Sequence, residues 1–189
     1  PIQYLGFPLS ISETFQQRNT NKSIIDALNE LEQIQNLCKK TNKTLVVYLS
    51  MGFGNPYNEP FNEEIVTNFT SIMATMGVEV VSLSDTIGVA EPELISKVFK
   101  SVIDEFPKIE IGAHFHSTPG TALDKIEAAY EAGCKRFDGA LKGYGGCPMA
   151  KDDLTGNIAT EAMISFFEAE QVDLNLDKIN FNKKYKNKI

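Results

Sequence analysis

The stretch from Val78 to Asp85, Val-Glu-Val-Val-Ser-Leu-Ser-Asp, is short and largely apolar. Such a run predicts a β-strand that is buried on both faces of a parallel sheet. Residues 92–106 come next and place apolar side chains at helical spacing, and a second apolar run follows at residues 109–116. A strand, a helix and a strand of these lengths predict a βαβ unit, in which the two strands are parallel.

The same alternation of short β-branched runs and longer amphipathic segments extends over most of the chain. Strands are expected at residues 2–7, 44–50, 78–85, 109–116 and 134–141. Helices are expected at residues 23–40, 59–76, 92–106, 118–133 and 160–171. This alternation predicts an α/β fold with a parallel sheet and helical crossovers.

Polar residues follow the carboxyl ends of these strands, which is where a (β/α)8 TIM barrel carries its active site. No glycine-rich phosphate-binding loop follows the first strand, so a nucleotide-binding doubly wound sheet receives no support. Five strands cannot close such a barrel, and the chain begins with Pro1 inside a strand, without an initiator methionine. We therefore expect a piece of a longer protein, in which residues 1–175 form the last five β-α units of a TIM barrel. Residues 176–189 are expected to form a polar tail.

The composition is that of a globular protein, with 42% hydrophobic and 23% charged residues in a chain of 189. A net charge of −7 argues against nucleic acid as a partner, because phosphate binding requires a basic surface. No apolar run approaches about 18 residues and no signal segment is present, so we expect neither a membrane span nor secretion. Three cysteines without paired spacing indicate reduced thiols in the cytoplasm or an organelle matrix. Of these, Cys38 and Cys134 are expected to be buried and without a chemical role.

The only two histidines, His114 and His116, stand two residues apart at the end of an expected strand. Such residues point to the same face of a strand, so the two imidazoles can converge on one metal ion. The alternative is a pair of polar strand-end residues that are satisfied by their neighbours. Asn157 offers an amide oxygen that hard divalent ions accept beside imidazole, although the pair Gly156-Asn157 is also typical of a plain turn.

Three further residues are candidates for acid–base chemistry. Asp85 ends a buried strand and is either a turn-capping acceptor or a hydrogen-bond acceptor and base near the metal. Cys147 lies in a glycine-rich loop, where a thiol can exchange protons with a substrate. Glu161 begins the last helix, where it suits the positive end of the helix dipole and can also orient metal ligands.

Four motifs stand out along the chain: Ser82-Leu-Ser-Asp-Thr-Ile-Gly-Val89, His114-Phe-His116, Lys142-Gly-Tyr-Gly-Gly-Cys-Pro148 and Thr155-Gly-Asn-Ile-Ala-Thr-Glu161. Together they resemble the hydroxymethylglutaryl-CoA lyase family, in the same order along most of the chain. The Gly-Gly-Cys-Pro loop is the specific part, because the His-x-His pair is shared by a wider superfamily of metal-dependent aldolases and synthases. The resemblance implies a (β/α)8 barrel, a bound Mg²⁺ or Mn²⁺ ion, and cleavage of hydroxymethylglutaryl-CoA to acetyl-CoA and acetoacetate.

The resemblance also implies a role for each candidate residue. The metal-ligand positions of the family match His114, His116 and Asn157. The loop cysteine, an active-site aspartate and a supporting acid match Cys147, Asp85 and Glu161. In the implied reaction Cys147 protonates the departing acetyl-CoA enolate, and either Asp85 or a histidine removes the hydroxyl proton.

The chain departs from the family in ways that bear on activity. The family also uses an Asp-Arg pair at the end of its first strand; neither residue is present here, so we expect the chain by itself to be inactive. Ser117 stands where many relatives have aspartate. An aldolase or condensing synthase of the same superfamily is the alternative enzyme, and a non-catalytic metal-binding relative is the alternative from another class. The expected partners are an acyl-CoA substrate and a second copy of the protein in a homodimer.

Overall fold

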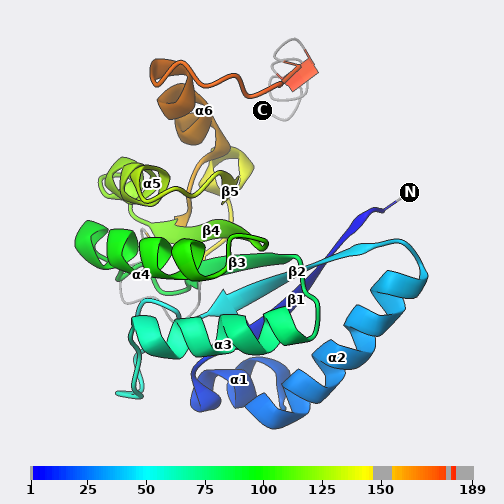
Figure 1. Cartoon of the computed structure of the whole chain (residues 1–189). Helices are drawn as coiled ribbons and strands as arrows, with labels where there is room; N and C mark the ends of the chain where they lie inside the picture. Colours follow the sequence, from blue (N-terminus) through cyan, green and yellow to red (C-terminus); the bar gives the residue numbers. More distant parts are fainter. Residues whose placement is uncertain (1, 147–154, 178–179, 182–189) are drawn as a thin grey trace.

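The computed structural model describes residues 2–146, 155–177 and 180–181. Its strands are β1 (Tyr4–Ser10), β2 (Thr44–Ser50), β3 (Val80–Asp85), β4 (Glu110–Ser117), β5 (Arg136–Asp138) and β6 (Gly156–Asn157). Its helices are α1 (Glu13–Thr20), α2 (Ile24–Lys40), α3 (Glu63–Thr75), α4 (Pro92–Glu105), α5 (Ala122–Glu131) and α6 (Thr160–Ala169). A short 3-10 turn, η1, covers Leu141–Gly143. Strands and helices thus alternate along the chain (Figure 1).

Strands β1 to β5 lie side by side in the order in which they occur along the chain, and each neighbouring pair is parallel. Helices α2 to α5 follow the strands along one side of the sheet (Figure 1). Sequential parallel strands with helices on one side are the pattern of a barrel, whereas a doubly wound sheet reverses its strand order and carries helices on both faces. The predicted α/β fold of the TIM-barrel type is therefore confirmed.

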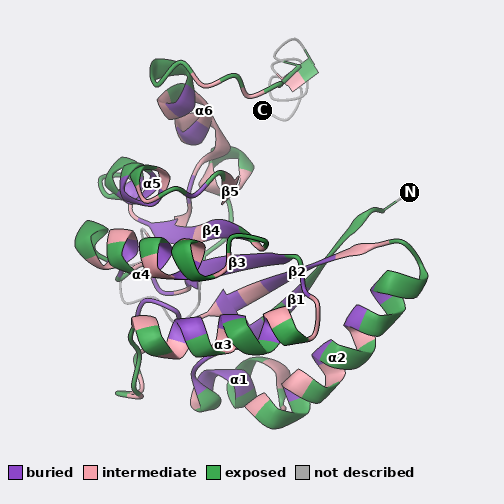
Figure 2. Cartoon of the chain, viewed as in Figure 1, coloured by how far each residue is buried: buried purple, intermediate pink, exposed green. Residues whose placement is uncertain are grey.

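The apolar core lies between the sheet and these helices. In Figure 2, β3 and β4 are largely buried, whereas the helices turn a buried stripe inwards and an exposed face outwards. Phe53, Phe99 and Phe115 form the aromatic centre of this core, with ring centroids 5.7 to 6.1 Å apart. Such ring pairs contribute about 0.5–1.5 kcal/mol each beyond the burial of apolar area. Through these contacts Phe115 packs the helix-facing side of β4 against the core.

The five predicted strands agree with the structure to within three residues at each end, whereas β6 was not predicted. Three helices differ from the prediction, and one of them, expected from residue 118, begins at Ala122. The helix expected from residue 59 begins at Glu63, because the side chain of Asn62 caps it by accepting the Ile65 N–H at 2.9 Å. Helix α1 was not predicted, since its eight residues are mostly polar and Phe15 is the one large apolar side chain that they bury. A short polar helix carries little of the apolar periodicity on which such predictions depend.

Cys38 and Cys134 are free thiols and are buried, as predicted. Across the helices that the structure describes, none combines the length and the apolar character needed to cross a membrane. Most of the tail expected at residues 176–189 lies outside the described residues, so that expectation stays a prediction.

Candidate active site

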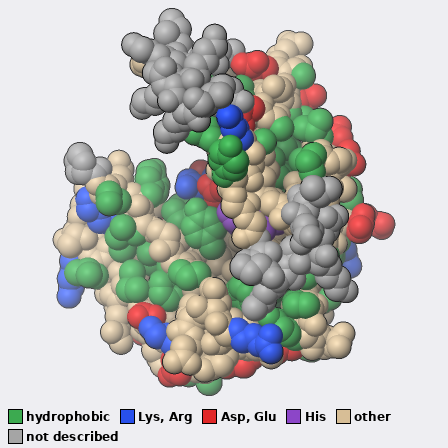
Figure 3. Space-filling view, turned by 180° about the vertical axis from the view of Figure 1, so that it is seen from behind, with side chains coloured by type: hydrophobic (Ala, Val, Ile, Leu, Met, Phe, Trp, Pro, Cys, Tyr) green, Lys and Arg blue, Asp and Glu red, His purple; other side chains and the backbone are tan. Residues whose placement is uncertain are grey.

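The carboxyl end of β4 carries the two histidines on one face. Because alternate residues of a strand point the same way, His114 and His116 share the face opposite to that of Phe115. Their ring centroids lie 5.5 Å apart, and Tyr48 of β2 makes an edge contact with His114 at 5.4 Å. Viewed from behind, the histidine side chains lie in a hollow of the surface (Figure 3). The structure thus brings the predicted pair of imidazoles together.

Both imidazoles favour their neutral form. Burial lowers the pKa of His114 below its ordinary value, and the charge of Asp138 opposes this effect. Burial also lowers the pKa of His116. The nearby His114 and Lys125 lower the pKa of His116 further, while Asp85 acts in the opposite direction. A neutral imidazole keeps a free lone pair, and this is the form that binds a metal ion.

A short antiparallel pairing brings Asn157 to the same place. Strand β6 runs against the end of β4, with Asn157 in register with His116. The amide nitrogen Nδ2 of Asn157 donates to the carbonyl oxygens of Tyr144 and Gly145, at 3.0 and 3.3 Å. These bonds use the donor side of the amide and leave its oxygen for another partner. The pair Gly156-Asn157 is therefore a strand rather than the plain turn that was the alternative.

The two imidazoles also carry polar atoms that the protein does not satisfy. Within the described residues, the buried Nδ1 atoms of His114 and His116 have no hydrogen-bond partner. Buried polar atoms are normally paired, so each exception needs an explanation. Two imidazoles and an amide oxygen fit part of the ligand set of a divalent ion. Residues 2–146, 155–177 and 180–181 hold no group of three or more His, Cys, Asp and Glu that could bind a metal ion. Asn157, whose amide oxygen can also be a ligand, is in register with His116.

Asp85 does not reach the face that carries the histidines. It is in register with Phe115, so its side chain lies on the helix-facing side of the sheet. Its carboxylate accepts the N–H groups of Val89 and Ala90 at 2.9 and 3.0 Å, and the Lys125 ammonium at 2.6 Å. These are the contacts expected if Asp85 caps the turn after β3, which was the alternative interpretation of this residue. The assignment of Asp85 as a base near the metal stays a prediction, and none of these contacts supports it.

Glu161 and Asn157 both hold the loop that precedes Cys147. The two carboxylate oxygens of Glu161 accept the backbone N–H of Lys142, at 2.9 and 3.2 Å. The backbone N–H of Asn157 donates to the carbonyl oxygen of Gly145 at 3.0 Å, which ties the same loop to β6. Cys147 itself lies outside the described residues. Its predicted place on this loop is therefore supported only by the positions of the residues that come before it.

The family of the chain follows from comparison with known proteins. The HMGL-like family matches residues 4–185, which is nearly the whole chain. The chain belongs to the HMGL-like family. A relative, the hydroxymethylglutaryl-CoA lyase YngG of Bacillus subtilis, is 38% identical over 168 residues, which are 89% of this chain and 56% of that protein. The chain thus spans just over half the length of this relative.

Solved structures of HMG-CoA lyases share the fold. A crystal structure of the Bacillus subtilis HMG-CoA lyase matches with a TM-score of 0.89 and 35% identity, and covers 98% of this chain and 62% of that one. An HMG-CoA lyase of Acinetobacter baumannii, solved in complex with coenzyme A and 3-methylmalate, matches with a TM-score of 0.80 and 28% identity. That match covers 90% of this chain and 55% of the other. The HMGL-like chain therefore has the architecture of these enzymes over most of its length.

A polar cluster beneath His114 was not predicted. In this HMGL-like chain, Tyr48 and Ser82 are in register on β2 and β3, and Asp138 of β5 is in register with His114. The Ser82 hydroxyl donates to Asp138 at 3.1 Å, and Tyr48 lies close enough to Asp138 to feel its charge. Burial raises the pKa of Tyr48, and the charge of Asp138 raises it further, so the phenol keeps its proton. Polar residues at alternate positions of buried strands are the sequence signal that indicates such a cluster.

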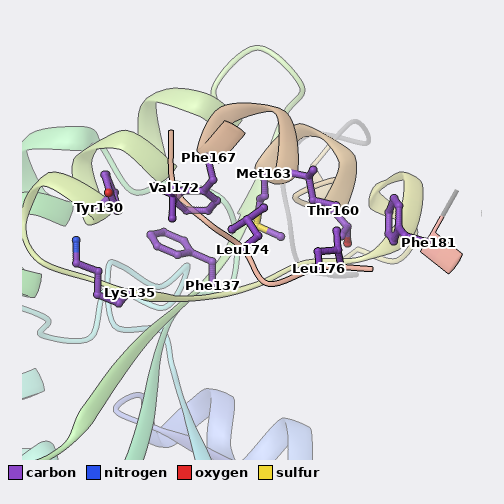
Figure 4. Close-up of a pocket in the computed structure, with 11 residues that line it drawn as sticks. Tyr130, Lys135, Phe137, Thr160, Met163, Phe167, Val172, Leu174, Leu176 and Phe181 are labelled. Carbon is purple, nitrogen blue, oxygen red and sulfur yellow. The ribbon is translucent and has the colours of Figure 1, made fainter. Parts of the chain in front are cut away.

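An apolar cavity of about 520 Å³ lies apart from the histidines. It is bounded by α5, β5, α6 and the residues after α6, and Figure 4 shows Phe137 and Phe167 beside each other among its lining residues, with ring centroids 5.1 Å apart. The predicted site residues that the structure describes do not line this cavity. We therefore assign it no part in the chemistry of the HMGL-like site.

Proposed function

We propose that this chain forms part of the active site of a hydroxymethylglutaryl-CoA lyase, which cleaves its substrate to acetyl-CoA and acetoacetate. The observation that carries the proposal is the register of β4 with β6, which brings two neutral imidazoles and the Asn157 amide to one place. The names of the relatives support it, because proteins 38% and 35% identical to this chain are HMG-CoA lyases. The chain spans 56% of the first of these, so the activity is proposed for the full reading frame that contains it.

We further propose a divalent ion, Mg²⁺ or Mn²⁺, with His114, His116 and Asn157 among its ligands. The buried Nδ1 atoms without partners in the described residues support this ligand set. The chemistry that such an ion supplies is a lower pKa of the substrate hydroxyl and a fixed geometry at the reacting carbon atoms. An acyl-CoA as substrate is supported by the relative that was solved with coenzyme A.

The proposed cleavage requires two proton transfers, which the protein arranges. The hydroxyl proton leaves the substrate, the carbon–carbon bond breaks, and its electron pair forms the enolate of acetyl-CoA. The Cys147 thiol gives its proton to the enolate carbon, and the proton taken from the hydroxyl restores the thiol. Asp85 is the predicted first acceptor and a histidine is the alternative. The ion pair between Asp85 and Lys125 argues against Asp85 in this role, because it holds the carboxylate away from the histidine face.

The remaining polar residues orient these groups. Tyr48 packs against the His114 ring in a T-shaped arrangement and so limits its rotation. Glu161 holds the main chain at Lys142, at the start of the glycine-rich loop. Both are positioning roles, since a reacting group must lie close to its target before proton transfer can be efficient.

The test is acetoacetate release from hydroxymethylglutaryl-CoA by the full reading frame, with Mn²⁺, with Mg²⁺ and with EDTA. We expect product only in the presence of a metal ion. Cys147→Ala should lower the rate by about 10²-fold or more, the usual contribution of a general acid. Cys38→Ala is the matched control and should keep the wild-type rate, because Cys38 is buried in the helix layer.

Two results would redirect the proposal. A folded, metal-loaded protein that releases no acetoacetate would contradict the lyase and favour an aldolase or synthase that acts on another oxo-acid. Activity that survives Cys147→Ala would point to the synthase branch, which does not use a loop cysteine.

A further inference from the structure

Lys125 of α5 is a buried cation beside the end of β4. Its side chain is 3% exposed, and that of its ion-pair partner Asp85 is 1% exposed. Lysine is almost never buried to this extent without a partner for its charge. Buried ion pairs are often no more stabilising than apolar residues of similar volume, so a contribution to stability does not by itself account for this one.

The contacts of Lys125 lead to the main chain of His116. Its ammonium donates to Asp85 Oδ2 at 2.6 Å and to the carbonyl oxygen of His116 at 3.1 Å. Asp85 in turn accepts the N–H groups of Val89 and Ala90, which fixes the turn after β3. One network of hydrogen bonds therefore links the end of β3, helix α5 and His116.

His116 needs such support because it lies beyond the ladder that holds the rest of β4. The register of β3 with β4 ends at Phe115, and the register of β5 with β4 ends at His114. In the part of the chain that the structure describes, β6 pairs with His116 from one side and Lys125 bonds to its carbonyl. The direction of a side chain follows the orientation of its backbone, so a fixed peptide group also fixes the imidazole.

We propose that Lys125 is a positioning residue, which sets the placement of the His116 imidazole relative to that of His114. Asp85 acts in this arrangement as the anchor of the lysine. The inference rests on the proposed function, because the two imidazoles are the centre of the proposed metal site.

The experiment compares variants of the full reading frame, each studied at a temperature at which melting curves show it to be folded. Lys125→Met removes the ammonium but leaves the charge of Asp85 unpaired, which can impair folding. The double variant Asp85→Asn/Lys125→Met removes both charges and keeps a side-chain oxygen for the turn after β3. Lys97→Met is the matched control, because Lys97 forms an ion pair of the same length, 2.6 Å, with Glu63 but is exposed.

Two measurements report on the histidines. The NMR signals of the imidazoles in the metal-free protein show the placement of the rings, and the Kd for Mn²⁺ shows whether they still form a site. We expect the double variant to displace or broaden the His116 signals and to raise the Kd by about 10- to 100-fold, the usual effect of losing a group that orients a metal ligand. Lys97→Met should change neither. Wild-type signals together with a wild-type Kd in the folded double variant would overturn the proposal and assign the pair to stability alone.

Failure of the proposed function gives a different result. A wild-type protein that binds Mn²⁺ but releases no acetoacetate contradicts the lyase, while the comparison of Kd values still decides the role of Lys125. A wild-type protein that binds no Mn²⁺ contradicts the metal site. In that case the NMR signals of the imidazoles alone decide whether Lys125 positions His116.

Discussion

His116 of β4 and Asn157 of β6 lie in antiparallel register, so residues from distant parts of the sequence share the end of one strand. Asn157 is also bonded to the loop before Cys147, through its backbone N–H to Gly145 and its side-chain amide to Tyr144. A change that moves β6 should therefore act both on the imidazole face and on the loop. This coupling is the basis of the first prediction.

Replacement of Asn157 separates its two proposed tasks. Asn157→Asp keeps an oxygen for a metal ion but cannot donate to the carbonyl groups of Tyr144 and Gly145. Asn157→Ala loses both functions. We expect the alanine variant to weaken Mn²⁺ binding by about tenfold or more, and the aspartate variant to retain binding while the amides of residues 141–146 exchange faster. Calorimetric titration and hydrogen exchange measure the two effects; equal Mn²⁺ affinities of wild type and alanine variant would contradict the ligand role.

Removal of the Glu161 carboxylate should loosen the loop from its other end. Glu161→Ala deprives the backbone N–H of Lys142 of both its acceptor oxygens. We expect the Lys142 amide to exchange about tenfold faster, which corresponds to roughly 1.4 kcal/mol for a hydrogen bond to a charged acceptor. Glu127→Ala, at an exposed position of α5, is the control. Exchange at Lys142 that is no faster than in the control would show that this contact does not hold the loop.

The central strands could be predicted from the sequence because a strand that is buried on both faces needs a continuous apolar run, as β3 has. Strand β6 could not, since two residues carry no periodic pattern and their pairing depends on the return of the chain to β4. Helix α1 is similar, because polar contacts fix its start: Ser12 accepts the Phe15 N–H and Glu59 accepts the Thr14 N–H. Of these two, the contact with Glu59 joins residues distant in the sequence and leaves no local signal.

In the candidate site, too, the features set by local sequence could be predicted and those set by tertiary contacts could not. The shared face of His114 and His116 follows from the period of a strand alone, so it could be predicted. The side of the sheet on which Asp85 lies depends on its register with Phe115, and this was not predicted. Lys125 was missed because a lysine in an amphipathic helix is expected to be exposed, and only its tertiary contacts show that it is buried.

The loop before Cys147 should tolerate no side chain at Gly143. This glycine has a φ of +67°, and an added Cβ would lie 2.8 Å from the carbonyl oxygen of Asn157. We expect Gly143→Ala to destabilise the protein by about 1–2 kcal/mol from the left-handed backbone alone. Gly120→Ala is the control, because its added Cβ would meet nothing within 4 Å. Urea unfolding of the full reading frame measures both; equal midpoints for the two variants would show that the close approach to Asn157 is relieved without cost.

Cys134 should be almost inert toward alkylation while the protein is folded. Burial raises the pKa of its thiol from the ordinary 9.0 to about 12, and this outweighs the opposite effects of the Arg136 backbone and the charge of Lys135. Because the thiolate is the reactive form, reaction with iodoacetamide at pH 8 should be about 10³-fold slower than in the unfolded chain. Between about pH 9 and pH 12 the thiol of Cys134 stays protonated in the folded protein but is ionised in the unfolded chain. Raising the pH through this range therefore lowers the free energy of unfolding. The contribution of Cys134 is full below pH 9 and declines as the pH rises above it. Mass spectrometry of the Cys134 peptide, with and without guanidinium, measures the ratio of rates, and rapid labelling of the native protein would contradict the buried thiol.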